Sequence, residues 1–175
     1  LMASARAILR SHARQYCSDL PALFAEINRH LIRDTGDERF LTLLYAVLQP
    51  ATREITVASG GHESLMWYRA SRHEVEEIES TGPLLGVIDG IRHEAAGPFV
   101  LAPGDVMLIS SDGLREAACP DGEQFGVERT IDALQAAAKQ PTAEAIHDHI
   151  LETLRAFCHE APFIDDVALI VLRGK

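Results

Sequence analysis

The chain has 175 residues, of which 47% are hydrophobic and 24% are charged, as in an ordinary globular protein with its own core. No apolar run approaches the roughly 20 residues of a membrane-spanning helix and no signal peptide is recognisable, so we expect no membrane partner. The formal net charge of −10 argues against nucleic-acid binding, because phosphate backbones are bound by basic surfaces.

The cysteines indicate a reducing compartment. Cys17, Cys119 and Cys158 lie far apart and form no CxxC pair, which disfavours both a disulfide framework and a zinc site. We therefore expect free thiols and a cytoplasmic location.

Two helices are predicted at the start of the chain. Residues 1–10 are helical in composition with no cap before them, so we expect the chain to begin inside a helix, with residues missing upstream. Ser18 and Asp19 offer an N-cap for a second helix through about Arg33. Residues 34–37 are predicted as the turn that ends it.

A series of short strands follows the helices. Strands are expected over residues 40–48, 54–58, 65–69, 74–78, 92–101 and 106–111. Because turns rather than helices join them, the sheets are predicted to be antiparallel.

The chain then returns to helix and closes with one strand. Helices are predicted over residues 127–138 and 143–158, the second capped by Thr142. Residues 167–172 are apolar throughout, so this strand is expected in the middle of a sheet. Together the elements predict an α+β sandwich forming a single domain over residues 1–175.

Acidic residues lie at the ends of two apolar strands. Asp112 follows the strand that ends at Ser111, and Asp165 and Asp166 precede the last strand. Carboxylates placed against buried strands need compensation, and a hard divalent cation with oxygen ligands is one source of it. The alternative is that these residues form turns and caps, because Asp-Gly is a favoured turn pair.

Seven short strings occur in one order and carry a family resemblance. They are the strings at residues 40–42 (FLT), 58–62 (ASGGH), 82–86 (GPLLG), 101–105 (LAPGD), 110–117 (SSDGLREA), 123–126 (EQFG) and 164–166 (IDD). This order resembles the bacterial SpoIIE-type branch of the metal-dependent protein phosphatases, the PPM or phosphatase 2C-like family. The match runs over nearly the whole chain.

The resemblance implies an α-β-β-α sandwich of antiparallel sheets flanked by helices, and hydrolysis of phosphoserine or phosphothreonine in a regulatory protein. By the same resemblance, Asp112 and Asp165 are metal ligands and catalytic residues, and the cofactor is Mn²⁺ or Mg²⁺, with two ions in the intact domain. A metal-activated water would attack the phosphate in line. His62 matches a structural loop and receives no catalytic role.

The family's Gly-Asp-x-x-Asp and Asp-Val-x-Gly-His-Gly motifs, which supply further metal ligands, are not found in the sequence. Residues 1–3 are similar to the stretch just beyond the second motif, so we expect that the N-terminal strands and their ligands lie upstream. The resemblance further implies a sensory or receiver domain upstream, and a phosphorylated partner such as an anti-anti-sigma factor.

A second hypothesis stays open beside the enzyme. Under this alternative, the domain would be a degenerate phosphatase-like module that binds a regulatory partner protein without hydrolysing anything. Aspartates in the upstream segment would support the enzyme, and their replacement would support the binding module.

Overall fold

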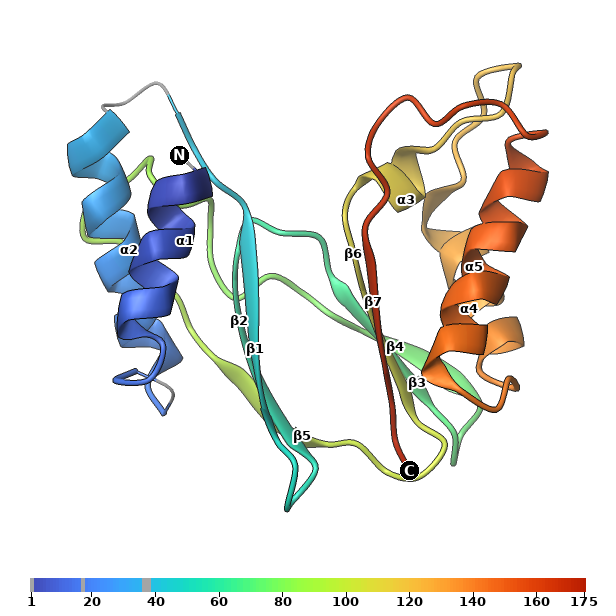
Figure 1. The fold of residues 1–175 in the computed structure, drawn as a ribbon, viewed down its shortest axis with the longest axis horizontal. Helices are drawn as coiled ribbons and strands as arrows, with labels where there is room; N and C mark the ends of the chain where they lie inside the picture. The colour runs from blue at the N-terminus through green and yellow to red at the C-terminus, as the bar shows by residue number, and fades with distance from the viewer. Residues whose placement is uncertain (1, 17, 36–38) are drawn as a thin grey trace. The chain divides into compact units, whose positions relative to one another are not determined.

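The computed structural model describes residues 2–16, 18–35 and 39–175 (Figure 1). These residues form two compact units, each with one antiparallel sheet and its own helices. The first unit takes in the described residues up to His62 together with Ser80–Val100, and the second takes in Glu63–Glu79 and Leu101–Lys175. No helix among the described residues is long and apolar enough to cross a membrane.

The first unit is a helical pair packed on a three-stranded sheet. Its elements are α1 (Met2–His12), α2 (Leu20–Thr35), β1 (Leu43–Gln49), β2 (Glu54–Gly60) and β5 (Ala96–Val100), with strand order β1-β2-β5 (Figure 1). Four apolar side chains of α2 recur at helical spacing in the core of this unit, and all are fully buried: Leu23, Phe24, Ile27 and Leu31.

The ends of α2 test the capping prediction. The Oδ1 atom of Asp19 accepts a hydrogen bond from the Ala22 amide at 3.0 Å, which confirms Asp19 as a cap. The helix continues to Thr35, so the turn predicted from residue 34 was placed too early. The rest of that turn, residues 36 and 37, lies outside the described residues.

The second unit is a four-stranded sheet with three helices. Its elements are β3 (Leu65–Arg69), β4 (Glu74–Ile78), β6 (Val106–Ser110), α3 (Gly113–Glu116), α4 (Gly126–Ala137), α5 (Ala143–Phe157) and β7 (Leu169–Arg173). The strand order is β4-β3-β6-β7, with every neighbouring pair antiparallel. Helices α4 and α5 lie side by side over one face of this sheet (Figure 1). Thr142 caps α5 as predicted, since its Oγ1 accepts from the Ala145 amide at 3.1 Å.

The position of β7 differs from the prediction. Its only strand neighbour among the described residues is β6, so β7 lies at the edge and not in the middle of the sheet. Leu169 and Val171 face the core, whereas the side chain of Ile170 is 56% exposed. The apolar run correctly predicted a strand, but the position of a strand in the sheet depends on partner strands that are remote in the sequence.

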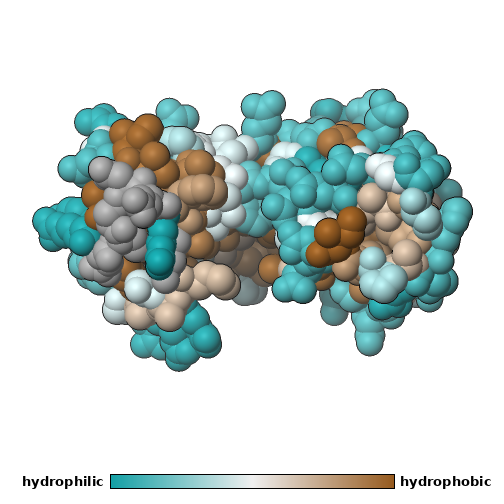
Figure 2. Space-filling view, turned by 90° about the horizontal axis from the view of Figure 1, so that it is seen from above, coloured by the Kyte–Doolittle hydropathy of each residue, from teal (hydrophilic) through white to brown (hydrophobic). Residues whose placement is uncertain are grey.

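One face of the surface is mostly hydrophilic. In the view of Figure 2 hydrophilic residues dominate, and hydrophobic residues appear in separate small groups. Of the three cysteines, Cys119 and Cys158 are buried free thiols, as predicted, and Cys17 lies outside the described residues.

One buried carboxylate explains the Pro-Gly-Asp string before β6. The side chain of Asp105 is 2% exposed and lies 3.6 Å from the Nε atom of Arg69. Its Oδ1 accepts from the Ala70 amide at 2.9 Å, and its Oδ2 accepts from the Ala102 amide at 3.3 Å. The string is therefore structural, because this carboxylate ties the turn before β6 to the end of β3.

We expect Asp105→Asn to lower the free energy of unfolding by about 1–3 kcal/mol, because an amide presents an N–H where one of these oxygens accepts. Urea denaturation measures the change, with Glu152→Gln on the exposed side of α5 as the control. A loss no larger than the control's would show that the buried carboxylate does not stabilise the turn.

Candidate metal site

The pairing of β6 with β7 brings the two acidic segments to one edge of the second unit. Ser110, at the end of β6, pairs with Leu169, at the start of β7. Because the strands are antiparallel, the residues that leave β6 and those that enter β7 emerge at the same edge. Asp112 and the Asp165–Asp166 pair therefore lie on adjoining loops.

Ser111 fixes these two loops to each other. Its Oγ donates to the Asp166 carbonyl and accepts from the Ala168 amide, both at 3.0 Å. Its own amide donates to the Ala168 carbonyl at 3.0 Å. Sequence reasoning assigned Ser111 no role beyond ending the strand before Asp112.

The approach of the loops also requires glycine at position 113. A Cβ atom there would lie 2.4 Å from the carbonyl oxygen of Asp166, well inside van der Waals contact. The Asp-Gly pair at 112–113 is thus needed for close packing and not only for a turn.

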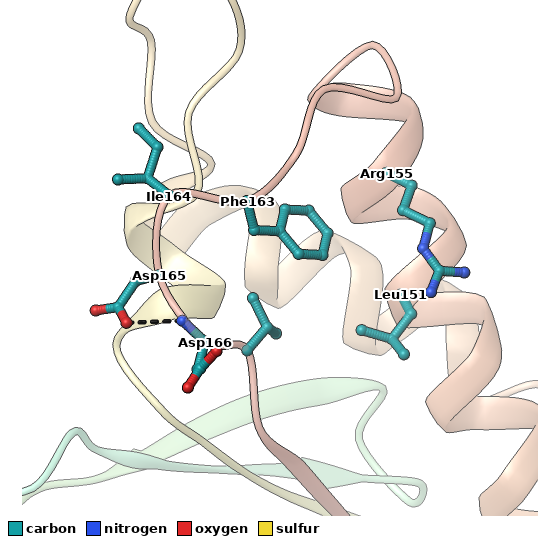
Figure 3. Close-up of a pocket in the computed structure, with 7 residues that line it drawn as sticks. Leu151, Arg155, Phe163, Ile164, Asp165 and Asp166 are labelled. Carbon is teal, nitrogen blue, oxygen red and sulfur yellow. Dashed lines mark hydrogen bonds between the residues drawn. The ribbon is translucent and has the colours of Figure 1, made fainter.

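Each candidate ligand makes one local hydrogen bond. The Oδ1 of Asp112 accepts from the Gly113 amide at 2.9 Å and caps α3. The Oδ1 of Asp165 accepts from the Asp166 amide at 2.7 Å (Figure 3). Both turn and cap roles raised by the sequence are therefore present.

The burial expected of these carboxylates is wrong. The strand β6 is buried along most of its length, but Asp112, Asp165 and Asp166 are all exposed, because the chain has already left the sheet when it reaches them. Desolvation therefore does not by itself require a cation here.

The donor set fits a hard divalent cation as part of its coordination. Asp112 and Asp165 each keep Oδ2 without a hydrogen-bond partner among the described residues. Within the same residues no group of three or more His, Cys, Asp or Glu side chains is placed to hold a metal. Mg²⁺ is commonly held by one or two carboxylates with several waters, so two aspartates suit such an ion but do not enclose it.

Two cavities lie on either side of the Asp165 loop. One, of about 440 Å³, is lined by α3 and its following loop together with Ile164 and Asp165. The other, of about 500 Å³, is lined by Leu151 and Arg155 of α5 and by residues 163–167. In Figure 3 the Asp165 carboxylate points away from the Arg155 side. Asp165 therefore lines both cavities, with its carboxylate directed away from Arg155.

A cysteine lies in the loop that follows α3. The Sγ atom of Cys119 donates to the Asp121 carboxylate at 2.6 Å. This hydrogen bond, with burial as a second cause, raises the pKa of the Cys119 thiol above its usual range. The same hydrogen bond is the main cause that lowers the pKa of Asp121. The thiol is held protonated, which makes it a poor nucleophile.

With this geometry established, similarity to known proteins decides the family. The full chain, residues 1–175, matches the family model described as Stage II sporulation protein E (SpoIIE). The chain belongs to the SpoIIE family. It is 26% identical over 151 residues to the phosphoserine phosphatase RsbU of Bacillus subtilis, covering 85% of this chain and 43% of RsbU. It is 24% identical over 146 residues to the protein IcfG of Synechocystis, covering 83% of this chain and 22% of IcfG. The chain thus spans less than half the length of both relatives.

Solved structures show the same fold in SpoIIE-type and related domains. The SiaA-PP2C domain of Pseudomonas aeruginosa is 25% identical, with a TM-score of 0.78 over 99% of this chain and 68% of that one. A manganese-presoaked SpoIIE phosphatase domain from Bacillus subtilis is 19% identical, with a TM-score of 0.64 over 97% of this chain and 71% of that one. The predicted α+β class, with antiparallel sheets and flanking helices, is confirmed.

The raised pKa of Cys119 gives a test of the loop after α3 in this SpoIIE-family chain. We expect Cys119 to react slowly with iodoacetamide at pH 8, and Asp121→Asn to speed its reaction, because the pKa falls when the accepting carboxylate is removed. Mass spectrometry measures the alkylation of each cysteine. Cys158, whose pKa is raised by burial alone, is the internal control and should not respond. An unchanged rate at Cys119 in the variant would contradict the contact.

Proposed function

We propose that this chain forms part of a metal-dependent phosphatase domain that removes phosphate from serine or threonine of a regulatory protein in signalling. The observation that carries the proposal is the Ser111 junction, which holds the loops of Asp112 and Asp165 together at one sheet edge. The naming of RsbU as a phosphoserine phosphatase and membership of the SpoIIE family support the same activity.

Asp112 and Asp165 are the proposed ligands, each through the oxygen that its local hydrogen bond leaves available. A bound Mn²⁺ or Mg²⁺ ion, with a second ion in the intact domain, would acidify a coordinated water and neutralise charge on the phosphate. Ser111 and Gly113 hold the ligand loops together. Asp121 keeps Cys119 protonated, so the chain's own groups favour a water nucleophile over a cysteine. The manganese-bound PstP domain, with a TM-score of 0.62 at 16% identity, supports the choice of metal.

The substrate and the setting are part of the proposal. We infer a phosphorylated regulator such as an anti-anti-sigma factor as substrate, a sensory or receiver domain upstream, and a cytoplasmic location. The solved structure of the RsbU and RsbW domains of a Mycobacterium tuberculosis protein, with a TM-score of 0.72 at 22% identity, supports a signalling role. The acidic net charge accords with the absence of a nucleic-acid partner.

One observation favours the binding-module alternative. Both carboxylates already serve as local caps, and the described residues offer no third ligand near them. A domain that had lost catalysis would keep such caps for its fold alone. The upstream ligands therefore decide between the two functions.

The first experiment is Mn²⁺-dependent hydrolysis of a phosphoserine protein by this chain and by the same chain extended upstream. We expect activity in the extended protein and little in the chain alone, because a divalent cation binds more oxygens than two aspartates supply. If neither protein hydrolyses the substrate, although the extended protein is folded and Mn²⁺ is supplied, the result would favour the binding module.

In the extended protein, we expect Asp112→Asn and Asp165→Asn each to lower turnover by about 100-fold or more, because metal stabilisation of the transition state is worth several kcal/mol. Asp166→Asn is the matched control beside Asp165, and we expect it to retain activity. Steady-state assays with thermal melts separate lost catalysis from lost folding. Undiminished turnover in Asp112→Asn would reject the site.

A further inference from the structure

We propose that Arg115 is a positioning residue, whose guanidinium holds Asp112 where it binds the metal. This inference rests on the proposed function, because it assigns a task to Arg115 only if Asp112 is a ligand. Arg115 does not touch the reacting atoms on this account. Its effect reaches the site through the helix that both residues share.

Helix α3, which carries both residues, is too short to hold its orientation by itself. Helix α3 has only four residues, Gly113–Glu116, and is joined to β6 by Ser111 and Asp112 (Figure 1). One turn of helix is not stable by itself, so its orientation depends on tertiary contacts. Asp112 is the N-cap of this turn, and its carboxylate is bonded to the Gly113 amide. Any tilt of α3 therefore moves the carboxylate.

Arg115 supplies the polar contacts that restrain α3. Its Nη1 donates to the Glu63 carboxylate at 2.8 Å, and its Nη2 donates to the Ser64 hydroxyl at 2.9 Å. Nη2 also lies 3.6 Å from the Glu77 carboxylate, which accepts from the Ser64 hydroxyl at 2.6 Å. Glu63 and Ser64 lie just before β3, about fifty residues before Arg115, and Glu77 lies in β4. The guanidinium thus ties α3 to a paired segment of the sheet.

The contacts of Arg115 are better suited to fixing the position of α3 than to stabilising the fold. The Arg115 side chain is 12% exposed, and its Nε atom is buried with no acceptor among the described residues. Burying a guanidinium with one donor unsatisfied costs free energy, so such a network contributes less stability than its ion pairs suggest. What it does provide is a forked, planar set of bonds with one preferred geometry.

The inference predicts a specific defect. In Arg115→Met the apolar stem is largely kept but α3 loses its polar restraint, so Asp112 must be ordered when the metal binds. We expect Mn²⁺ affinity to fall by about 10- to 100-fold, the range seen when groups that orient metal ligands are removed. Because the ligand itself is intact, excess Mn²⁺ should restore turnover in Arg115→Met but not in Asp112→Asn.

Arg69→Met is the matched control in the same unit. Arg69 also bridges two carboxylates, at 3.5 Å to Glu76 and 3.6 Å to Asp105, and lies over the Trp67 ring. It stands at the end of β3 that faces the start of β6, away from Ser110 and the site. Its loss should lower the melting temperature while leaving the Mn²⁺ requirement unchanged.

The measurement uses the protein extended upstream. Electron paramagnetic resonance of free Mn²⁺ gives the affinity of each variant, and turnover is followed against Mn²⁺ concentration. If Arg115→Met does not fold, Ser64→Ala is the second test. It keeps the guanidinium but removes the hydroxyl between Arg115 and Glu77, and we expect a smaller shift in the same direction.

The outcomes separate this inference from the proposed function. Weaker Mn²⁺ binding in Arg115→Met, with Arg69→Met unchanged, supports the positioning role. If Arg115→Met binds Mn²⁺ as tightly as the unaltered protein while Asp112→Asn loses the metal, the positioning role is wrong. If Arg115→Met does not fold, the same result in Ser64→Ala overturns the positioning role. Failure of the unaltered extended protein to bind Mn²⁺, or full binding by Asp112→Asn, overturns the proposed function and the inference with it.

Discussion

The hydroxyl of Ser111 donates to the Asp166 carbonyl and accepts from the Ala168 amide, so that one side chain holds the loop before β7 against the end of β6. The β6–β7 ladder brings these segments to the same edge, but the ladder ends at Ser110 and Leu169. Beyond that point Ser111 and the close packing at Gly113 keep the loops together. The candidate site therefore depends on two small residues as much as on its aspartates.

The two aspartates that flank β6, Asp105 and Asp112, have different roles, and their burial distinguishes them. Asp105, before the strand, is buried and bound by two amides and the Arg69 guanidinium, so its oxygens are used within the fold. Asp112, after the strand, is exposed and makes one local bond. An exposed carboxylate with an oxygen to spare costs little when no ligand is bound and offers that oxygen to a cation. Burial thus separates a structural carboxylate from a candidate ligand at opposite ends of the same strand.

The one-turn helix α3 is held by contacts at both of its ends. Its start carries Asp112 and packs on the Asp166 carbonyl, while Arg115 reaches the β3–β4 hairpin. After α3, the chain forms the loop in which Asp121 holds the Cys119 thiol. Because so short a helix has no stability of its own, each neighbour constrains the next. This gives the acidic edge a defined geometry although its carboxylates face solvent.

Local patterns in the sequence predicted most of the elements, although not the one-turn helix α3, and tertiary contacts decided the site. Strands β3 and β4 have the predicted bounds, and the caps Asp19 and Thr142 were recognised, because alternation and capping act between residues close in the chain. The sequence also singled out Asp112 and Asp165. It did not give the edge position of β7, the exposure of the carboxylates, or the contacts of Arg115. Those features depend on partners some fifty or more residues away, as Ser111 is from Asp166 and Arg115 from Glu63, and no local periodicity records such pairings.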